Sequence, residues 1–424
     1  MVDNSYQMSR LGNGLRIITS PTSNTRSVCL SFFIGAGGRY EGEEEAGVSH
    51  FMEHLCFKGA QRWATARAIS EAIEGVGGIL NGGTDKELTI YWCKVARDHF
   101  PLALDVLSDM VIHSQFKTEA VEMERQVILE EINMCLDSPP QRVNTLIDEV
   151  LWPHDALGRD VVGSRETVSG LTRESLMDYR EELYLPSNTV ISVAGDIEHG
   201  EVMERLGRVF GAWQDRQPRP MFPTDDGQKT PRILLEYKDT EQAHLCLALR
   251  GLSSLDPRRF TLDLLNIILG EGMSSRLFLE IRENRGLAYD IGSYVSHFRD
   301  AGCLIVGAGV DPSRLDTTIT AILRELARLR EPIPREEITK AKEFSKGRLL
   351  LHLEETRNMT RWTGAQELLT RRILSLDEVL SIVDAITAQD LQELATDLIS
   401  TQKLSLAVVG PVRNSRRLKK LLTV

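Results

Sequence analysis

The sequence predicts an α+β fold with two structurally similar domains, each an antiparallel sheet with helices packed on one face. Strand and helix patterns do not alternate regularly along the 424 residues, which favours sheets with helices on one face. Segments of the first half also recur in the second. Residues 27–35 align with 243–251 at an offset of 216, and residues 172–195 align with 387–410 at an offset of 215. Two nearly equal offsets at opposite ends of a domain indicate a duplication.

The elements of the first half follow from local patterns. A hairpin is expected over residues 6–20, because Asn13-Gly14 favours a tight turn. Residues 27–34 form an apolar run typical of a buried strand, and the glycine-rich residues 35–38 end it. Beyond these, we expect helices over residues 66–75, 102–113 and 117–136 and strands over residues 79–81 and 88–95.

A change of composition separates the two halves. Residues 213–231 contain Pro218, Pro220, Pro223 and Pro231 among charged side chains, without apolar periodicity. Such a segment is typical of a linker. We therefore expect one domain at residues 1–215, a linker at 216–231 and the duplicated domain at 232–424.

Composition restricts the class of protein. A net charge of −11 argues against nucleic acid and anionic membrane as main partners. Residues 1–10 are polar, and no apolar run approaches the roughly 18 residues that a membrane span needs. The six cysteines occur singly, without a C-x-x-C pair, as expected of reduced thiols. These features predict a cytoplasmic protein without a membrane segment.

The stretch from Gly47 to Gly59 contains the pattern H-x-x-E-H at His50, Glu53 and His54. On a helix, two histidines four residues apart share one face, so both imidazoles can reach one ion, and the glutamate lies on that face between them. Two neutral histidines with a carboxylate beside them are typical of a catalytic zinc site in which the carboxylate acts as general base.

The long helix expected at residues 117–136 offers the carboxylates for a third ligand. Glu124 and Glu131 are seven residues apart, two turns along one face. Glu130 points about 100° away from Glu131. Helix geometry alone therefore leaves Glu124 and Glu131 as alternatives.

Beyond the motif, the chain resembles the pitrilysin/insulysin family of inverted-motif zinc peptidases, in the short-chain branch that includes mitochondrial processing peptidase β and bacterial processing-type peptidases. The resemblance extends over almost the whole chain and is carried by residues 11–15, 50–59, 78–81, 124–131, 157–159 and 274–278. It implies that zinc is held by His50, His54 and Glu131. It also implies that Glu53 activates water and that Glu124 either supports the ligands from behind or faces the substrate.

The second half has no H-x-x-E-H pattern, and its helix expected at residues 260–269 contains no histidine. The resemblance implies a different task for it, in which Arg282 and Tyr289 hold the substrate and the oxyanion of the transition state. Both side chains can donate hydrogen bonds to an oxygen that gains negative charge. The chain departs from the family at Gly82-Gly83, where relatives usually carry a small residue and then often an aromatic one.

The resemblance implies a zinc-dependent endopeptidase that hydrolyses unfolded or extended peptides. The family builds its chambers from two two-domain halves, so one chain of this length implies a dimer, and a homodimer is favoured because the chain carries both residue sets. The zinc domain of one chain would then face Arg282 and Tyr289 of the other. The alternatives are the active or regulatory half of a heterodimeric processing peptidase, a catalytically silent half, and a structural subunit of a respiratory complex.

Overall fold

The computed structural model describes residues 6–22, 24–225 and 227–424, and the chain divides into two compact units. The first unit contains the described residues up to Ile132 together with residues 160–222 and 350–376. The second contains residues 133–159, 223–349 and 377–424. Each half of the chain therefore lends a segment to the other unit, unlike the contiguous domains 1–215 and 232–424 expected from the sequence. Residues 1–5 of the polar start lie outside the described residues.

The first unit is built on a six-stranded sheet with the order β1-β2-β6-β3-β5-β4. Its strands are β1 (Gln7–Arg10), β2 (Arg16–Pro21), β3 (Ser27–Ile34), β4 (Ile79–Thr84), β5 (Thr89–Ala96) and β6 (Thr189–Gly195). All neighbouring strands are antiparallel except β2 and β6, which are parallel. The sheet is thus mixed, whereas the sequence analysis expected a purely antiparallel one.

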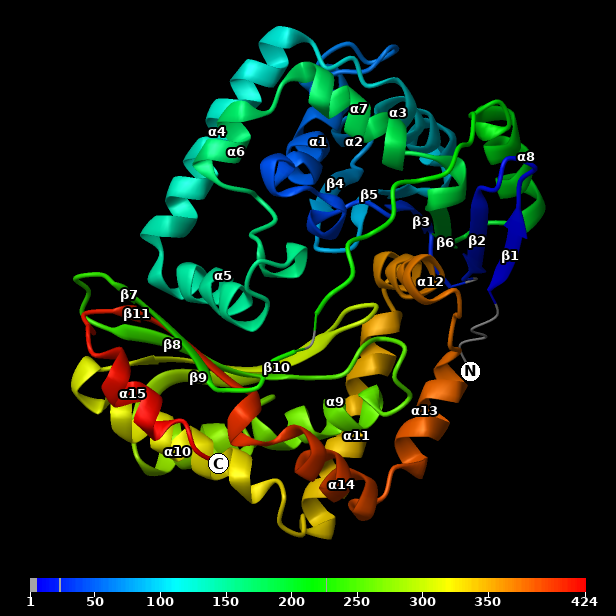
Figure 1. Ribbon diagram of the computed structural model, residues 1–424. Helices are drawn as coiled ribbons and strands as arrows, with labels where there is room; N and C mark the ends of the chain where they lie inside the picture. The colour runs from blue at the N-terminus through cyan, green and yellow to red at the C-terminus, as the bar shows by residue number, and fades with distance from the viewer. Residues whose placement is uncertain (1–5, 23, 226) are drawn as a thin grey trace. The chain divides into compact units, whose positions relative to one another are not determined.

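Helices cover both faces of this sheet (Figure 1). The helices of the first unit are α1 (Val48–Cys56), α2 (Ala66–Glu74), α3 (Phe100–His113), most of α4 (Thr118–Asp137), α6 (Arg165–Gly170), α7 (Arg173–Leu183), α8 (His199–Phe210) and α12 (Thr356–Thr370). Phe32 of β3 packs into the core that contains Phe51 of α1. Its neighbour Phe33 points to the other face, into a cluster with Leu368 of α12.

Helix α12 explains why the expectation of a single covered face is incomplete. It comes from the second half of the chain but packs on β3 and β6 of the first unit (Figure 1). Buried hydroxyl pairs join it to the sheet, with Ser31 Oγ 2.7 Å from Thr360 Oγ1 and Ser192 Oγ 2.9 Å from Thr363 Oγ1. Helix and sheet approach so closely that a Cβ on Gly364 would lie 2.2 Å from the Phe33 ring.

The second unit repeats the topology of the first. Its sheet has the order β7-β11-β8-β10-β9, again with one parallel pair, β7 and β11. The strands are β7 (Arg232–Tyr237), β8 (Ala243–Arg250), β9 (Ala288–His297), β10 (Gly302–Val310) and β11 (Leu404–Gly410). Strands β8 and β11 occupy the places of β3 and β6, as the offsets of 216 and 215 in the sequence predict. The predicted duplication and the α+β class are confirmed.

Helices also cover both faces of the second sheet. The second unit contains α5 (Pro139–Leu151), α9 (Arg259–Leu269), the π-helix η6 (Phe278–Asn284), α10 (Leu315–Arg328), most of α11 (Arg335–Leu353), nearly all of α13 (Leu376–Ala385), α14 (Ala388–Leu398) and α15 (Ser415–Leu421). Helix α5, from the first half of the chain, packs Ile147 into a cluster with Ala248 and Ala407. Leu262 of α9 and Ala395 of α14 lie on the opposite face and border one small apolar cavity together with Leu249.

The first part of the expected linker is fixed to the first unit. Arg219 forms ion pairs with Glu45 and Glu182, each with a nitrogen–oxygen distance of 2.6 Å. The Phe222 amide donates to the carbonyl oxygen of Arg39 at 2.9 Å. Over the described residues, no helix combines the length and the apolar character needed to cross a membrane.

Candidate metal centre

Helix α1 is held in place just before its first histidine. Gly47, at its N-terminus, has a positive φ of 96° and no side chain with which to cap the helix. The buried Glu41 carboxylate takes this role by accepting hydrogen bonds from the amides of Gly47 at 2.8 Å and Ser49 at 2.9 Å. A carboxylate at this end satisfies free amides and interacts favourably with the helix dipole. The core packing of Phe51 and Leu55 then leaves His50, Glu53 and His54 on the remaining face.

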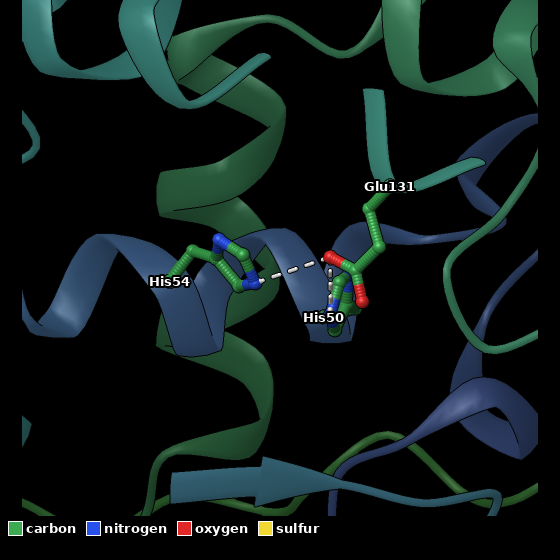
Figure 2. Close-up of side chains that lie close together, drawn as sticks. All are labelled: His50, His54 and Glu131. Atoms are coloured by element: carbon green, nitrogen blue, oxygen red, sulfur yellow. Dashed lines mark ion pairs between the residues drawn. The ribbon is translucent and has the colours of Figure 1, made fainter. Parts of the chain in front are cut away.

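His50, His54 and Glu131 converge, as Figure 2 shows. One carboxylate oxygen of Glu131, on α4, lies 3.7 Å from Nε2 of His50 and 3.7 Å from Nε2 of His54. The three ligand atoms lie within 4.8 Å of one another, and no other such group of His, Cys, Asp or Glu side chains occurs in the described part of the chain. The structure thus places Glu131 beside the histidines, while Glu130 is exposed to solvent.

The spacing of these atoms fits a zinc ion. Zinc binds imidazole nitrogen at about 2.0–2.1 Å and carboxylate oxygen at about 2.0–2.2 Å. Atoms 3.7 Å apart can both lie at such distances from a common point. The donor set, two imidazoles and one carboxylate, is one that catalytic zinc sites use.

Glu124 orients His54. Its Oε2 lies 3.1 Å from His54 Nδ1, and its Oε1 lies 2.8 Å from Lys58 Nζ. Because a carboxylate only accepts, Nδ1 of His54 carries the proton and Nε2 keeps its lone pair toward Glu131. Burial alone would raise the pKa of Glu124, but hydrogen bonds from His54 and Lys58 lower it below its usual value. Lys58 lies four residues after His54 within the motif stretch, and its ion pair with Glu124 was not expected from the sequence.

His50 is neutral. Burial, and then the neighbouring His54, lower the pKa of its imidazole to about 3. A neutral ring is the form that binds a metal. Its buried Nδ1 has no hydrogen-bond partner among the described residues, so His50 lacks the support that Glu124 gives His54.

Glu53 lies beside this cluster, and a residue of strand β4 hydrogen-bonds to its carboxylate. The hydroxyl of Thr84 donates a hydrogen bond to Glu53 Oε2 at 2.8 Å. Burial raises the pKa of Glu53, the Thr84 hydrogen bond and His54 lower it, and the charge of Glu131 raises it, with a net upward shift. A carboxylate with a raised pKa is suited to accept a proton near neutral pH.

Two family models match successive parts of the chain. Residues 16–165 match the family described as Insulinase (Peptidase family M16), and residues 170–344 match the Peptidase M16 inactive domain. A Bacillus subtilis protein named uncharacterized zinc protease YmxG is 36% identical over 408 residues, which cover 95% of this chain and 97% of that protein. The uncharacterized zinc protease SCO5738 of Streptomyces coelicolor is 36% identical over 420 residues, 97% of this chain and 91% of that protein.

The chain belongs to peptidase family M16. The predicted resemblance to the short, processing-type branch of the pitrilysin/insulysin family is confirmed.

Solved structures share the M16 fold over nearly the whole chain. A protease from Helicobacter pylori superposes with a TM-score of 0.91 at 20% identity, covering 96% of this chain and 100% of that one. A Pseudomonas fluorescens protein titled peptidase M16 inactive domain superposes with a TM-score of 0.90 at 18% identity, covering 96% of this chain and 98% of that one. A chain of complex III2 from Candida albicans superposes with a TM-score of 0.85 at 18% identity, covering 99% of this chain and 100% of that one.

The second unit of this M16 chain lacks the histidine pair and carries Arg282 and Tyr289. Helix α9 contains no histidine. The Arg282 guanidinium, on η6, lies 4.7 Å from the ring centres of Phe278 and of Tyr289. Two aromatic faces can fix a guanidinium. Arg282 Nε also lies 3.7 Å from Glu283 Oε1. Tyr289, on β9, is 78% exposed.

Proposed function

We propose that this chain is a zinc-dependent endopeptidase that hydrolyses unfolded or extended peptides. The observation that carries the proposal is the convergence of His50 Nε2, His54 Nε2 and the Glu131 carboxylate, with Glu53 alongside. Relatives that align with almost the whole chain are named zinc proteases. His50, His54 and Glu131 would hold the ion.

Each side chain has a defined task in this mechanism. Zinc, when bound, supplies Lewis-acid polarisation at neutral pH. Glu53 accepts a proton from the attacking water and passes it to the amide nitrogen as the peptide bond breaks. Glu124 keeps His54 in the tautomer that turns its Nε2 toward the ion. Arg282 and Tyr289 donate hydrogen bonds to the carbonyl oxygen as it gains negative charge.

Strand β4 is the proposed binding site for the peptide main chain. It is the last strand of the first sheet, and among the described residues it pairs only with β5, so its other edge can accept a partner strand. An extended peptide can add to such an edge through main-chain hydrogen bonds. Gly82 and Gly83 carry no side chains, so we expect little side-chain selectivity from these two positions.

The proposed assembly is a cytoplasmic homodimer that encloses the substrate in a chamber. The alternatives are a subunit without activity and one half of a heterodimeric peptidase. The fold shared with a chain of complex III2 is a reason to retain the first alternative. The presence of His50, Glu53, His54 and Glu131 in one chain favours the active form.

One experiment tests the proposal directly. The purified protein is analysed for metal content and incubated with a library of unstructured peptides, with and without a chelator. We expect about one zinc ion per chain, because each chain carries one ligand set. Internal cleavage should disappear with the chelator and return with added zinc. Protein that is folded and zinc-loaded but leaves every peptide intact would favour the inactive-subunit alternative.

A further inference from the structure

Strand β4 reaches Glu53 through one side chain. Thr84, the last residue of the strand, lies at the edge of the sheet and pairs with Thr89 of β5. Its hydroxyl donates to Glu53 Oε2 at 2.8 Å. The other carboxylate oxygen, Oε1, lies 3.1 Å from the position that a Cβ on Gly82 would occupy. The two alternate residues of the strand thus border the two oxygens of the carboxylate.

Thr84 is the donor in its hydrogen bond with Glu53. An ionised carboxylate can only accept, so the single proton of the Thr84 hydroxyl points to Glu53. The Thr89 hydroxyl lies 3.0 Å from the carbonyl oxygen of Ala36 and 3.4 Å from Thr84 Oγ1. It can therefore give its own proton to the carbonyl or to Thr84 without competing for Glu53.

We propose that Thr84 is a positioning residue that holds the carboxylate of Glu53 in the orientation needed for proton transfer. This inference rests on the proposed function, in which Glu53 is the general base. A glutamate on a helix surface has several rotatable bonds, whereas a threonine within a strand has a restricted χ1 angle. The hydrogen bond from the strand thus restricts the Glu53 side chain, which could otherwise adopt several rotamers.

The same contact joins substrate binding to the base. In the proposed function a peptide adds to the free edge of β4, and Thr84 belongs to this strand. The Thr84 hydroxyl bonds to Glu53 and Thr89, and none of its hydrogen bonds among the described residues goes to His50, His54 or Glu131. Thr84 should therefore govern turnover and leave zinc affinity unchanged.

Two variants separate the effect of the hydroxyl from the effect of packing. Thr84→Val removes the hydroxyl and keeps the branched shape, and Thr84→Ser keeps the hydroxyl. We expect Thr84→Val to lower kcat roughly tenfold, the effect of losing one hydrogen bond to a charged group. KM, the zinc dissociation constant and the unfolding midpoint should stay near wild type. Thr84→Ser should retain most of the activity.

A matched control measures the general effect of the exchange. Thr320, an exposed residue of α10, donates its hydroxyl to the Asp316 carbonyl oxygen at the same 2.8 Å. Thr320→Val should change neither kcat nor zinc affinity. Wild-type kcat in Thr84→Val would overturn the proposal, as would equal losses in Thr84→Val and Thr84→Ser, or a loss of zinc affinity parallel to the loss of activity.

Crystal structures of the zinc-loaded variants provide a readout that needs no activity. In Thr84→Ser the Glu53 side chain should keep its wild-type rotamer. In Thr84→Val it should adopt a different rotamer or several rotamers. An unchanged Glu53 in Thr84→Val would refute the positioning role even in a protein that cleaves nothing. A wild-type protein that binds no zinc and cleaves no peptide would instead refute the proposed function.

Discussion

Glu53 and His54 are neighbours in the sequence but have different tasks in the proposed mechanism. Glu53→Gln should keep zinc, because His50, His54 and Glu131 remain. It should lose activity by about 10²–10⁴-fold, because an amide cannot accept the proton. His54→Ala should lose both. Metal analysis and peptide cleavage on the same preparations check this, and near-normal turnover in Glu53→Gln would exclude Glu53 as the base.

The adjacent carboxylates of α4 provide a second comparison between single residues. Glu131 lies near both histidines, whereas Glu130 is exposed. Glu131→Gln should greatly weaken zinc binding, because it replaces a proposed direct ligand. Glu130→Gln serves as the control and should bind zinc like wild type. Zinc loss in Glu130→Gln with retention in Glu131→Gln would contradict the ligand assignment.

Glu124 acts through its contact with His54. Glu124→Gln removes the charge that holds the proton on His54 Nδ1, and substitutions of such supporting groups typically weaken metal binding by about 10–100-fold. We expect a loss of zinc affinity in this range, measured by competition with a chelator of known affinity. The exposed Glu122, on the same helix, offers the control variant Glu122→Gln. An unchanged affinity in Glu124→Gln would show that His54 needs no such support.

At the scale of the element, local patterns located β1 to β5 and α1 to α4, and packing between distant segments decided what the patterns left open. The apolar run 27–34 coincides with β3, and the expected helix 117–136 with α4, which ends before Pro139. The parallel pairing of β2 with β6 and the packing of α12 on β3 involve residues far apart in sequence, so no local periodicity reports them.

The same distinction applies to the site. Histidines four residues apart in one helix predict a shared metal site from their spacing, and the structure brings their Nε2 atoms near one carboxylate. Glu131 needed the family resemblance, because helix geometry left Glu124 as an alternative. Thr84 reaches Glu53 through the pairing of β4 in the sheet, which no spacing in the sequence reveals.

The close contact of α12 with β3 gives a prediction about stability. A methyl group at Gly364 would collide with the Phe33 ring at 2.2 Å. Gly364→Ala should therefore lower the free energy of unfolding by about 1–3 kcal/mol, as overpacking does. Gly207→Ala, in α8 of the same unit, meets no atom within 4 Å and should raise it by about 0.5–1 kcal/mol. Denaturant unfolding measures both, and equal effects would contradict the close packing of α12.

At the scale of the whole molecule, duplication has given two units with the same sheet topology and different candidate site residues. The strand order of the second sheet repeats that of the first without β1. The first unit holds His50, His54 and Glu131, and the second holds Arg282 and Tyr289. If both sets serve one reaction, as we propose, the assembly must bring a first unit and a second unit to the same substrate.

A mixing experiment tests whether the two sets come from different chains. In the proposed homodimer, the zinc ligands and Glu53 of one chain meet Arg282 and Tyr289 of its partner, so a twofold dimer has two composite sites. Glu53→Gln and Tyr289→Phe should each be inactive alone. In a mixed dimer one site then carries both lesions and the other carries none.

Random exchange makes half of the dimers mixed, so activity should recover to about a quarter of wild type. Tagged chains, purified in sequence, show independently that exchange has occurred. If each site were built within one chain, every site would keep one lesion and no activity would return. Absence of recovery in verified mixed dimers would therefore exclude the shared site, and it would leave the assignment of His50, His54 and Glu131 to zinc unaffected.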